Sequence, residues 1–130
     1  MSAKAKAGIA ADMNRMQTGR LGEQLAEEFL CKKGMQIIGR RFRVRGGEID
    51  LVAKDGDEIV FVEVKTRRGN AFGYPEQSVD SRKLLRMDIA AQQFFIQHED
   101  ISNAKFRFDI VAVELSDKGA NILHIDGFCL

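Results

Sequence analysis

The stretch EIVFVEVKTR, residues 58–67, decides the fold of this chain. Its β-branched and aromatic residues form an almost continuous apolar run, and such a run predicts a strand buried inside a sheet. Glu63 and Lys65 interrupt the run two residues apart, so they share one face of the strand. Because burying an unpaired charge is costly, these two residues require either a partner or a function.

The residues just before this strand also place acidic side chains in an apolar strand. GEIDLVA, residues 47–53, alternates so that Glu48 and Asp50 are expected on one face and Ile49 and Leu51 on the other. The turn residues 55–57, Asp-Gly-Asp, predict a hairpin that joins a strand at 48–54 to one at 58–66. The hairpin therefore brings acidic residues of two strands to one face.

Two hairpin registers fit the sequence. A loop of residues 55 and 56 would pair Glu48 with Glu63, whereas a loop of residues 55–58 would pair Asp50 with Glu63 and Glu48 with Lys65. The second register puts the Asp50 and Glu63 Cβ atoms about 5 Å apart. Two carboxylates that close repel each other, and a hard divalent cation such as Mg²⁺ between them removes the conflict. The backbone carbonyl of Val64 is also in reach of such a metal ion.

Helices are predicted on either side of the hairpin in the chain. The first extends from a capping Thr18 to about Lys33, followed by Gly34, and the second from Asp80 to about Gln97. The expected buried stripe of the first helix is Leu21, Leu25 and Phe29, with Ala26 and Leu30 alongside. That of the second is Leu84, Met87, Ala91, Phe94 and Phe95.

Further strands are predicted at 35–44, 106–115 and 121–126, with a loop at 68–77. The order αβββαββ indicates an α/β fold with a mixed central sheet of four to five strands and helices packed on it. We expect one domain at 18–130 behind a flexible leader at 1–17.

Composition narrows the class of protein. The chain of 130 residues is 45% hydrophobic and 30% charged, as in a globular protein, and no apolar run is long enough to span a membrane. Cys31 and Cys129 lack a CxxC partner, so we expect a reduced, cytoplasmic protein without a cysteine zinc site. His98 and His124 have no zinc or HNH spacing and are expected to be ordinary surface residues.

The four blocks GRLGEQLAEEFL, RGGEIDLVA, VFVEVKTR and RFDIVAV carry a resemblance. Asp50, followed after twelve residues by Glu63-Val64-Lys65, resembles the motif of the PD-(D/E)XK nuclease superfamily, which includes restriction endonucleases and Holliday-junction resolvases. The blocks together resemble the YraN-like family of small bacterial proteins. The resemblance covers about residues 18–115 and implies a restriction-endonuclease-like core.

The resemblance also implies roles for individual residues. Asp50 and Glu63 match the metal ligands, for Mg²⁺ or Mn²⁺, and Lys65 matches the catalytic lysine. Glu23 matches a glutamate that resolvase-like members carry on the first helix. Ile49 stands where the superfamily name expects proline, a departure that resolvase-like branches tolerate. Dimeric resolvase-like relatives suggest, by analogy, a homodimer here.

Several polar residues have alternative interpretations. Asp50, Glu63 and Lys65 would also fit a structural ion-pair network, Glu48 a salt bridge to Lys65 or an arginine, and Glu23 a solvated helix edge. Asp109 is expected to pair with an arginine, Arg107 or Arg43. Residues 69–75 fit either a substrate loop or a plain connection.

The net charge of +1 is unevenly distributed, and the basic residues gather in three groups that would suit phosphate. The candidate nucleic-acid contacts are Arg43, Arg67, Arg82, Lys83 and Arg86. Three functions remain open. They are a metal-dependent nuclease acting on branched or structured DNA, a nucleic-acid-binding module that does not cleave, and an interaction protein of a repair or uptake assembly.

Overall fold

A computed structural model describes residues 14–69 and 79–128 and contains two α-helices, a short 3₁₀ helix and five strands. In chain order these are α2 (Arg15–Lys32), β1 (Gln36–Val44), β2 (Gly47–Asp55), β3 (Glu58–Arg68), α3 (Ser81–Gln97), η2 (Glu99–Ile101), β4 (Phe106–Ser116) and β5 (Gly119–Ile125). The predicted order αβββαββ is confirmed. Of the predicted loop at 68–77, Arg68 lies in β3 and residues 70–77 lie outside the described residues.

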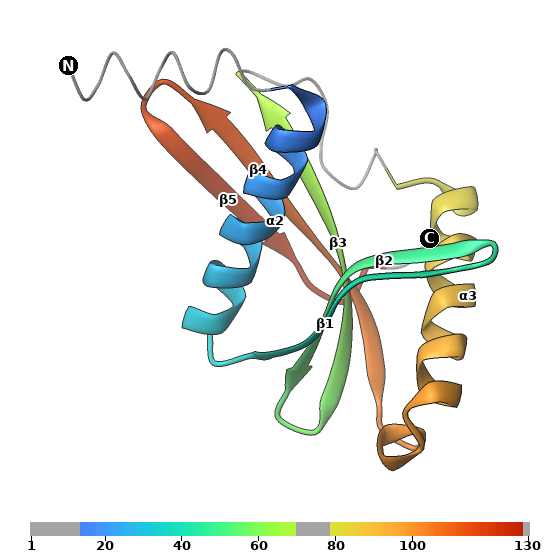
Figure 1. The fold of residues 1–130 in the computed structure, drawn as a ribbon. Helices are drawn as coiled ribbons and strands as arrows, with labels where there is room; N and C mark the ends of the chain where they lie inside the picture. Colours follow the sequence, from blue (N-terminus) through green and yellow to red (C-terminus); the bar gives the residue numbers. More distant parts are fainter. Residues whose placement is uncertain (1–13, 70–78, 129–130) are drawn as a thin grey trace.

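The five strands form one mixed sheet in the order β1-β2-β3-β4-β5. All neighbours are antiparallel except β3 and β4, which are parallel. A parallel pair needs a crossover, and the chain between β3 and β4 contains α3. Figure 1 shows α2 over one side of the sheet and α3 over the other. The fold is therefore α/β, as predicted, and is consistent with a restriction-endonuclease-like core.

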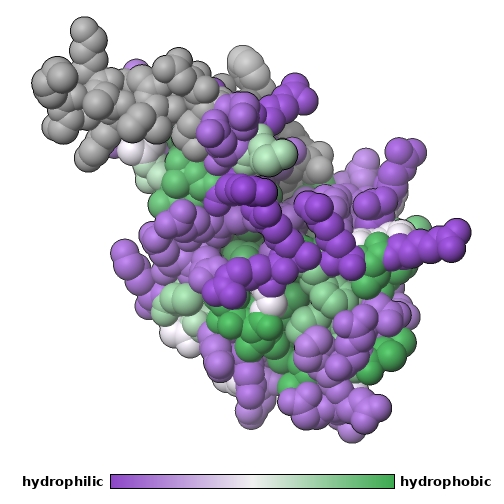
Figure 2. All heavy atoms as spheres, viewed as in Figure 1, coloured by the Kyte–Doolittle hydropathy of each residue, from purple (hydrophilic) through white to green (hydrophobic). Residues whose placement is uncertain are grey.

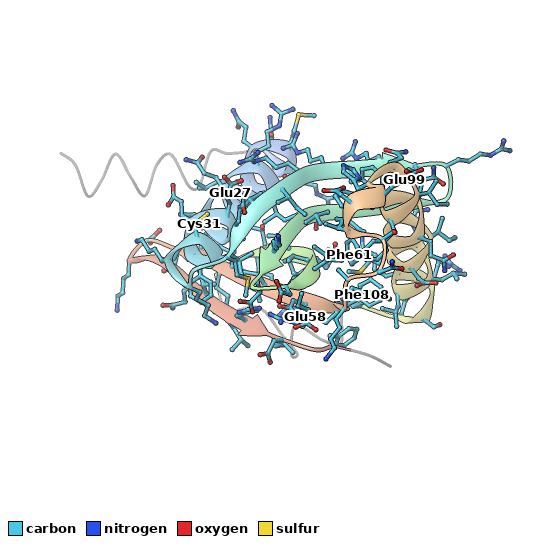
Figure 3. The ribbon with its side chains drawn as sticks, turned by 90° about the horizontal axis from the view of Figure 1, so that it is seen from below. Glu27, Cys31, Glu58, Phe61, Glu99 and Phe108 are labelled. Atoms are coloured by element: carbon cyan, nitrogen blue, oxygen red, sulfur yellow. The ribbon has the colours of Figure 1, made fainter. Side chains whose placement is uncertain are left out.

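The sheet separates two hydrophobic cores of different composition. On the α2 side, aliphatic residues dominate, including Ala26, Leu30 and Val62. On the α3 side, aromatic rings gather around the fully buried Phe61, which is in edge contact with Phe94. Figure 3 shows Phe61 on the side of the sheet that carries α3. Burial of both faces of β3 explains its nearly continuous apolar sequence.

The first helix begins three residues before the predicted Thr18. Asn14 is its N-cap, and a reciprocal pair of hydrogen bonds with Gln17 forms a capping box. Thr18 lies inside the helix and is buried together with Gly22, Ala26 and Leu30. The predicted stripe of Leu21, Leu25 and Phe29 is only partly buried and borders this row. Burial of Ala26 and Leu30, which were expected alongside the stripe, is confirmed, whereas burial of the small residues Thr18 and Gly22 was not predicted.

Two glycines set how closely the helices approach the sheet. A Cβ atom on Gly22 would lie 1.8 Å from the Thr66 hydroxyl oxygen of β3. A Cβ atom on Gly47 would lie 2.5 Å from the Arg86 carbonyl oxygen of α3. Because neither position tolerates a side chain without movement, α2 is held against β3 and α3 against the start of β2.

The sheet splits at one end of the β2–β3 hairpin. The pairing of β2 with β3 extends from the Asp55–Glu58 pair to the Leu51–Val62 pair. Beyond that point β2 continues beside β1, whereas β3 continues beside β4. In Figure 1 the β1–β2 hairpin extends toward α3, whereas β3 and β4 run toward the start of α2. The next residues in register at this fork are Asp50 and Glu63. No helix in the described ranges is long and apolar enough to cross a membrane.

Candidate carboxylate site at the fork of the sheet

Asp50 and Glu63 meet where β2 and β3 part. The observed register is the second of the two predicted ones, in which these residues are opposite each other. The Val64 amide donates a hydrogen bond of 2.8 Å to Asp50 Oδ2. The Asp50 carboxyl therefore accepts a backbone donor at the point where the strand ladder ends.

The electrostatic environment of Asp50 is unusual. Burial, a hydrogen bond with Glu63 and the charge of Glu63 together raise the pKa of the Asp50 carboxyl to about 8. The Val64 amide and the charge of Lys83 act in the opposite direction. At neutral pH the Asp50 carboxyl therefore keeps its proton, and it faces Glu63, whose side chain is only 9% exposed.

The strand around Asp50 departs from regular alternation. Ile49 packs in the α3 core and Leu51 in the α2 core, so the prediction that these two residues share a face is wrong. On β1, the register places Arg41 opposite Asp50, and Arg41 has a φ of 48°. A left-handed conformation at a non-glycine residue is uncommon and is often found at functional sites. The irregularity turns Asp50 toward β3.

Lys83, at the start of α3, completes the cluster. Its Nζ lies 3.0 Å from Glu63 Oε2 and 3.3 Å from Glu48 Oε1. Glu48 is also 3.8 Å from Arg43 Nε. The expected pairing of Glu48 with an arginine is thus found, its pairing with Lys65 is not, and the principal partner, Lys83, was not predicted.

Glu23 and Lys65 lie together on the α2 side of the fork. They line a cleft of about 520 Å³ with Thr18, Val64 and other residues of α2 and β3. Glu23 is not free in this cleft, because Arg41 Nε donates to its Oε1 at 2.8 Å. Within residues 14–69 and 79–128 the Lys65 side chain makes no ion pair. The fork therefore has one face with Lys83 and another with Lys65.

The donor set fits a hard divalent cation in part. The Asp50 carboxyl keeps its proton beside Glu63, and a cation that prefers oxygen ligands could replace that proton. Among the described residues, no three His, Cys, Asp or Glu side chains converge as a ready metal site. Asp50 and Glu63 would thus hold the ion as a pair, with water or phosphate completing its coordination. Whether Val64 contributes its carbonyl stays a prediction.

Several basic residues lie on the elements that form the site. Of the predicted nucleic-acid contacts, Arg43, Arg82 and Arg86 are exposed, Arg67 is half-buried and Lys83 is held in the cluster. A neighbouring cleft beside Glu23 is lined by Arg41 and by two arginines that were not among the predicted basic groups, Arg15 and Arg20. Their clustering depends on α2 lying next to β1, which no local pattern reveals. Figure 2 shows hydrophilic residues in a band across the face that carries the β1–β2 hairpin.

A second polar network lies at the turn end of the hairpin. Asp109 is fully buried and accepts hydrogen bonds from Arg107, from His124 Nε2 at 2.7 Å and from the Gly127 amide. The predicted Arg107 partner is confirmed. His124, with 5% of its side chain exposed, was wrongly expected at the surface, and so was His98, which is half-buried and stacks on Phe94. Lys33 contacts His124 Nδ1 at 2.8 Å, so this network ties α2 to the sheet.

The fold and this site define an α/β protein with paired carboxyl groups at a split in its central sheet. The profile of the uncharacterised protein family UPF0102 matches residues 22–113, and the chain belongs to this family, which confirms the YraN-like resemblance. A UPF0102 protein of Caldicellulosiruptor saccharolyticus is 43% identical over 106 residues, 82% of this chain and 89% of the relative. One of Clostridioides difficile is 39% identical over 109 residues, 84% of this chain and 95% of the relative.

Proposed function

We propose that the protein is a metal-dependent nuclease that hydrolyses phosphodiester bonds in branched or otherwise structured DNA. The observation that carries this proposal is the meeting of Asp50 and Glu63 at the fork, where burial and the charge of Glu63 disfavour the ionised form of Asp50 and so favour a proton or another cation there. A structural network would surround the carboxylate with donors, as Arg107, His124 and the Gly127 amide surround Asp109 at the other end of the hairpin.

Each candidate residue has a role that its position supports. Asp50 and Glu63 would hold Mg²⁺ or Mn²⁺, and such an ion supplies Lewis acidity toward a phosphate oxygen and a lower pKa for water. Lys65, without an ion-pair partner among the described residues and lining the cleft, would orient the attacking water and stabilise the charge that develops on the phosphate. Glu23 would complete the acidic site after leaving Arg41.

Cleavage is tested with a panel of single-stranded, duplex, flap, four-way and RNA substrates, with and without Mn²⁺. We expect the parent to cut a structured DNA with Mn²⁺. Asp50→Asn, Glu63→Gln and Lys65→Met should each lose at least about 100-fold in rate, because removing one stabilising group at such a site typically costs that much. Glu114→Gln, an exposed acid on β4, is the matched control and should keep parental activity.

Binding is tested separately from cleavage in the presence of EDTA. Since phosphate contacts release counterions, affinity for DNA should fall steeply between 50 and 200 mM salt, on the order of 10³-fold for about six contacts. Arg82→Glu and Arg86→Glu should weaken binding to every sequence. No detectable binding at low salt to any substrate would rule out both nucleic-acid functions.

The second candidate is a nucleic-acid-binding module that does not cleave. It is supported by the ion pairs of Glu23 with Arg41 and of Glu63 with Lys83, which occupy two of the carboxylates that a nuclease needs. Salt-sensitive binding together with no cleavage of any substrate in Mn²⁺ would favour this candidate.

A further inference from the structure

Lys83 is placed like a bound cation rather than like a surface lysine. Its ammonium bridges carboxylates of two strands, 3.0 Å from Glu63 and 3.3 Å from Glu48, and only 26% of its side chain is exposed. Arg82 and Arg86, on the same helix, are exposed to solvent. A lysine in the first turn of a helix could simply extend into solvent. The position of Lys83 between two carboxylates therefore requires an explanation.

Local structure fixes this placement. Asp80 caps α3 by accepting a hydrogen bond of 2.9 Å from the Lys83 amide, which holds the first turn. Gly47 lets the helix backbone approach β2 at Arg86 and Ala90, one turn or two beyond Lys83. The helix is therefore held at both points, and the lysine side chain extends from a rigid base into the fork.

The ammonium and a divalent ion would compete for the same carboxylate. Glu63 is the residue that would hold the metal together with Asp50, and one of its oxygens is in contact with Lys83. A hard divalent ion favours carboxylate oxygens that are not already neutralised by a neighbouring cation. The positive charges of the Lys83 ammonium and of a divalent ion on the same carboxylate would also repel each other strongly, because water is partly excluded there.

We infer that Lys83 is the resident counter-ion of Glu63 and Glu48, that a divalent ion must displace it from Glu63, and that Lys83 thereby sets the metal affinity of the site. The inference rests on the proposed function in that the displacing ion is the proposed Mg²⁺ or Mn²⁺. Once displaced, the ammonium stays beside the fork on the flexible side chain and is available to a phosphate oxygen. Lys83 is therefore a positioning residue distinct from Lys65.

The first test measures Mn²⁺ binding by calorimetry to the parent, Lys83→Met and Arg82→Met. Methionine keeps much of the length of the lysine stem and removes its charge. Lys83→Met should bind Mn²⁺ about ten-fold more tightly or better, because the ion no longer replaces a partly buried partner. Arg82→Met removes the same charge from the neighbouring exposed position and should leave the affinity within about two-fold of the parent, since exposed charges are well screened.

The second test uses only the parent and so does not depend on how the variant folds. Reductive methylation of lysines, read by mass spectrometry, should label Lys83 slowly in EDTA and faster by several-fold with saturating Mn²⁺. Exposed Lys118 serves as the internal control and should label equally in both conditions. Unchanged labelling of Lys83, or identical Mn²⁺ isotherms for the parent and Lys83→Met, would overturn the inference.

These outcomes are separable from failure of the proposed function. A parent that binds Mn²⁺ with the predicted dependence on Lys83 and cuts no substrate supports the inference and contradicts the nuclease. A parent that binds no Mn²⁺ contradicts the inference even where Lys83→Met binds it, because no ion then displaces Lys83. Absence of Mn²⁺ binding by both proteins contradicts the inference as well.

Discussion

Asp50 is held by the fold in a position that disfavours its ionised form, because its carboxyl is buried next to Glu63. Its carboxyl is held by the Val64 amide, sits against Glu63 and lies opposite Arg41, whose backbone is in the left-handed region. Each of these contacts comes from a different strand or strand position. The site is thus formed by the splitting of the sheet rather than by one motif.

The raised pKa of Asp50 gives stability an unusual dependence on pH. The folded state holds this proton up to about pH 8, whereas the unfolded chain releases it near pH 4. The free energy of unfolding should therefore fall as pH rises through this window, with a slope of at most about 1.4 kcal/mol per pH unit from this group. Below pH 4 the contribution is fully present, and above about pH 8 it is lost.

Asp50→Asn should remove that slope, because asparagine resembles the protonated acid and still offers an oxygen to the Val64 amide. In EDTA at pH 8 its melting temperature should equal or exceed that of the parent. Melting curves of the two proteins between pH 5 and pH 8.5 measure this. A variant that is clearly less stable across the whole range would show that Asp50 is ionised and structurally paired.

At the scale of elements, the sequence patterns located the strands well. The alternation and the apolar runs in residues 36–68 follow directly from which side chains of each strand are buried. The contacts between elements were harder to predict. Lys83 was assigned only to a basic surface, because its approach to Glu63 depends on how closely α3 packs at Gly47. The capping box of Asn14 and Gln17 could have been predicted from the spacing of these two residues, but the apolar pattern that was used to place the helix did not include them.

The small-residue row of α2 provides a matched pair of substitutions. Gly22→Ala would place a methyl group against Thr66, while Gly19→Ala, one turn away, meets nothing within 4 Å. We expect Gly19→Ala to stabilise the protein by about 0.5–1 kcal/mol through helix propensity. Gly22→Ala should destabilise it by roughly 1–3 kcal/mol, the usual cost of overpacking, and should shift Glu23 relative to Lys65.

Urea unfolding of the two glycine variants gives both values. If Gly22→Ala were as stable as Gly19→Ala, the helix would have to lie farther from β3 than the structure places it, and the cleft that contains Glu23 and Lys65 would be wider. A loss of metal-dependent activity in Gly22→Ala alone would link the helix spacing to the site.

At the scale of the whole molecule, Asp109 connects parts of the chain that share no local sequence. Through Arg107 it reaches Glu58 and Asp55 at the hairpin turn, through His124 it reaches Lys33, the C-cap of α2, and it binds the Gly127 amide. Hydrogen bonds from His124 and Arg107 outweigh burial and hold the pKa of Asp109 below its ordinary value. Its stabilising contribution is therefore present at neutral pH and is lost only as pH falls below about 4.

Asp109→Asn should lower the free energy of unfolding by roughly 3 kcal/mol, because it removes the fully buried charge that Arg107 and His124 contact and leaves Arg107 only the more exposed Glu58 and Asp55. The melting temperature of a domain of this size would then fall by about 10 °C. Asp117→Asn, at an exposed turn, is the control and should change stability by less than about 0.5 kcal/mol. Equal melting temperatures for the two variants would mean that the network adds nothing to stability.

The single parallel pairing in the sheet has a consequence for the order of folding. β1, β2 and β3 follow one another through short turns, so their contacts close small loops and form quickly. Pairing of β3 with β4 must wait for the long connection through α3, whose closure costs more chain entropy. Asp50 and Glu63 both belong to the early meander, so the nascent chain exposes two facing acids to solvent ions before β4 and the helices enclose them.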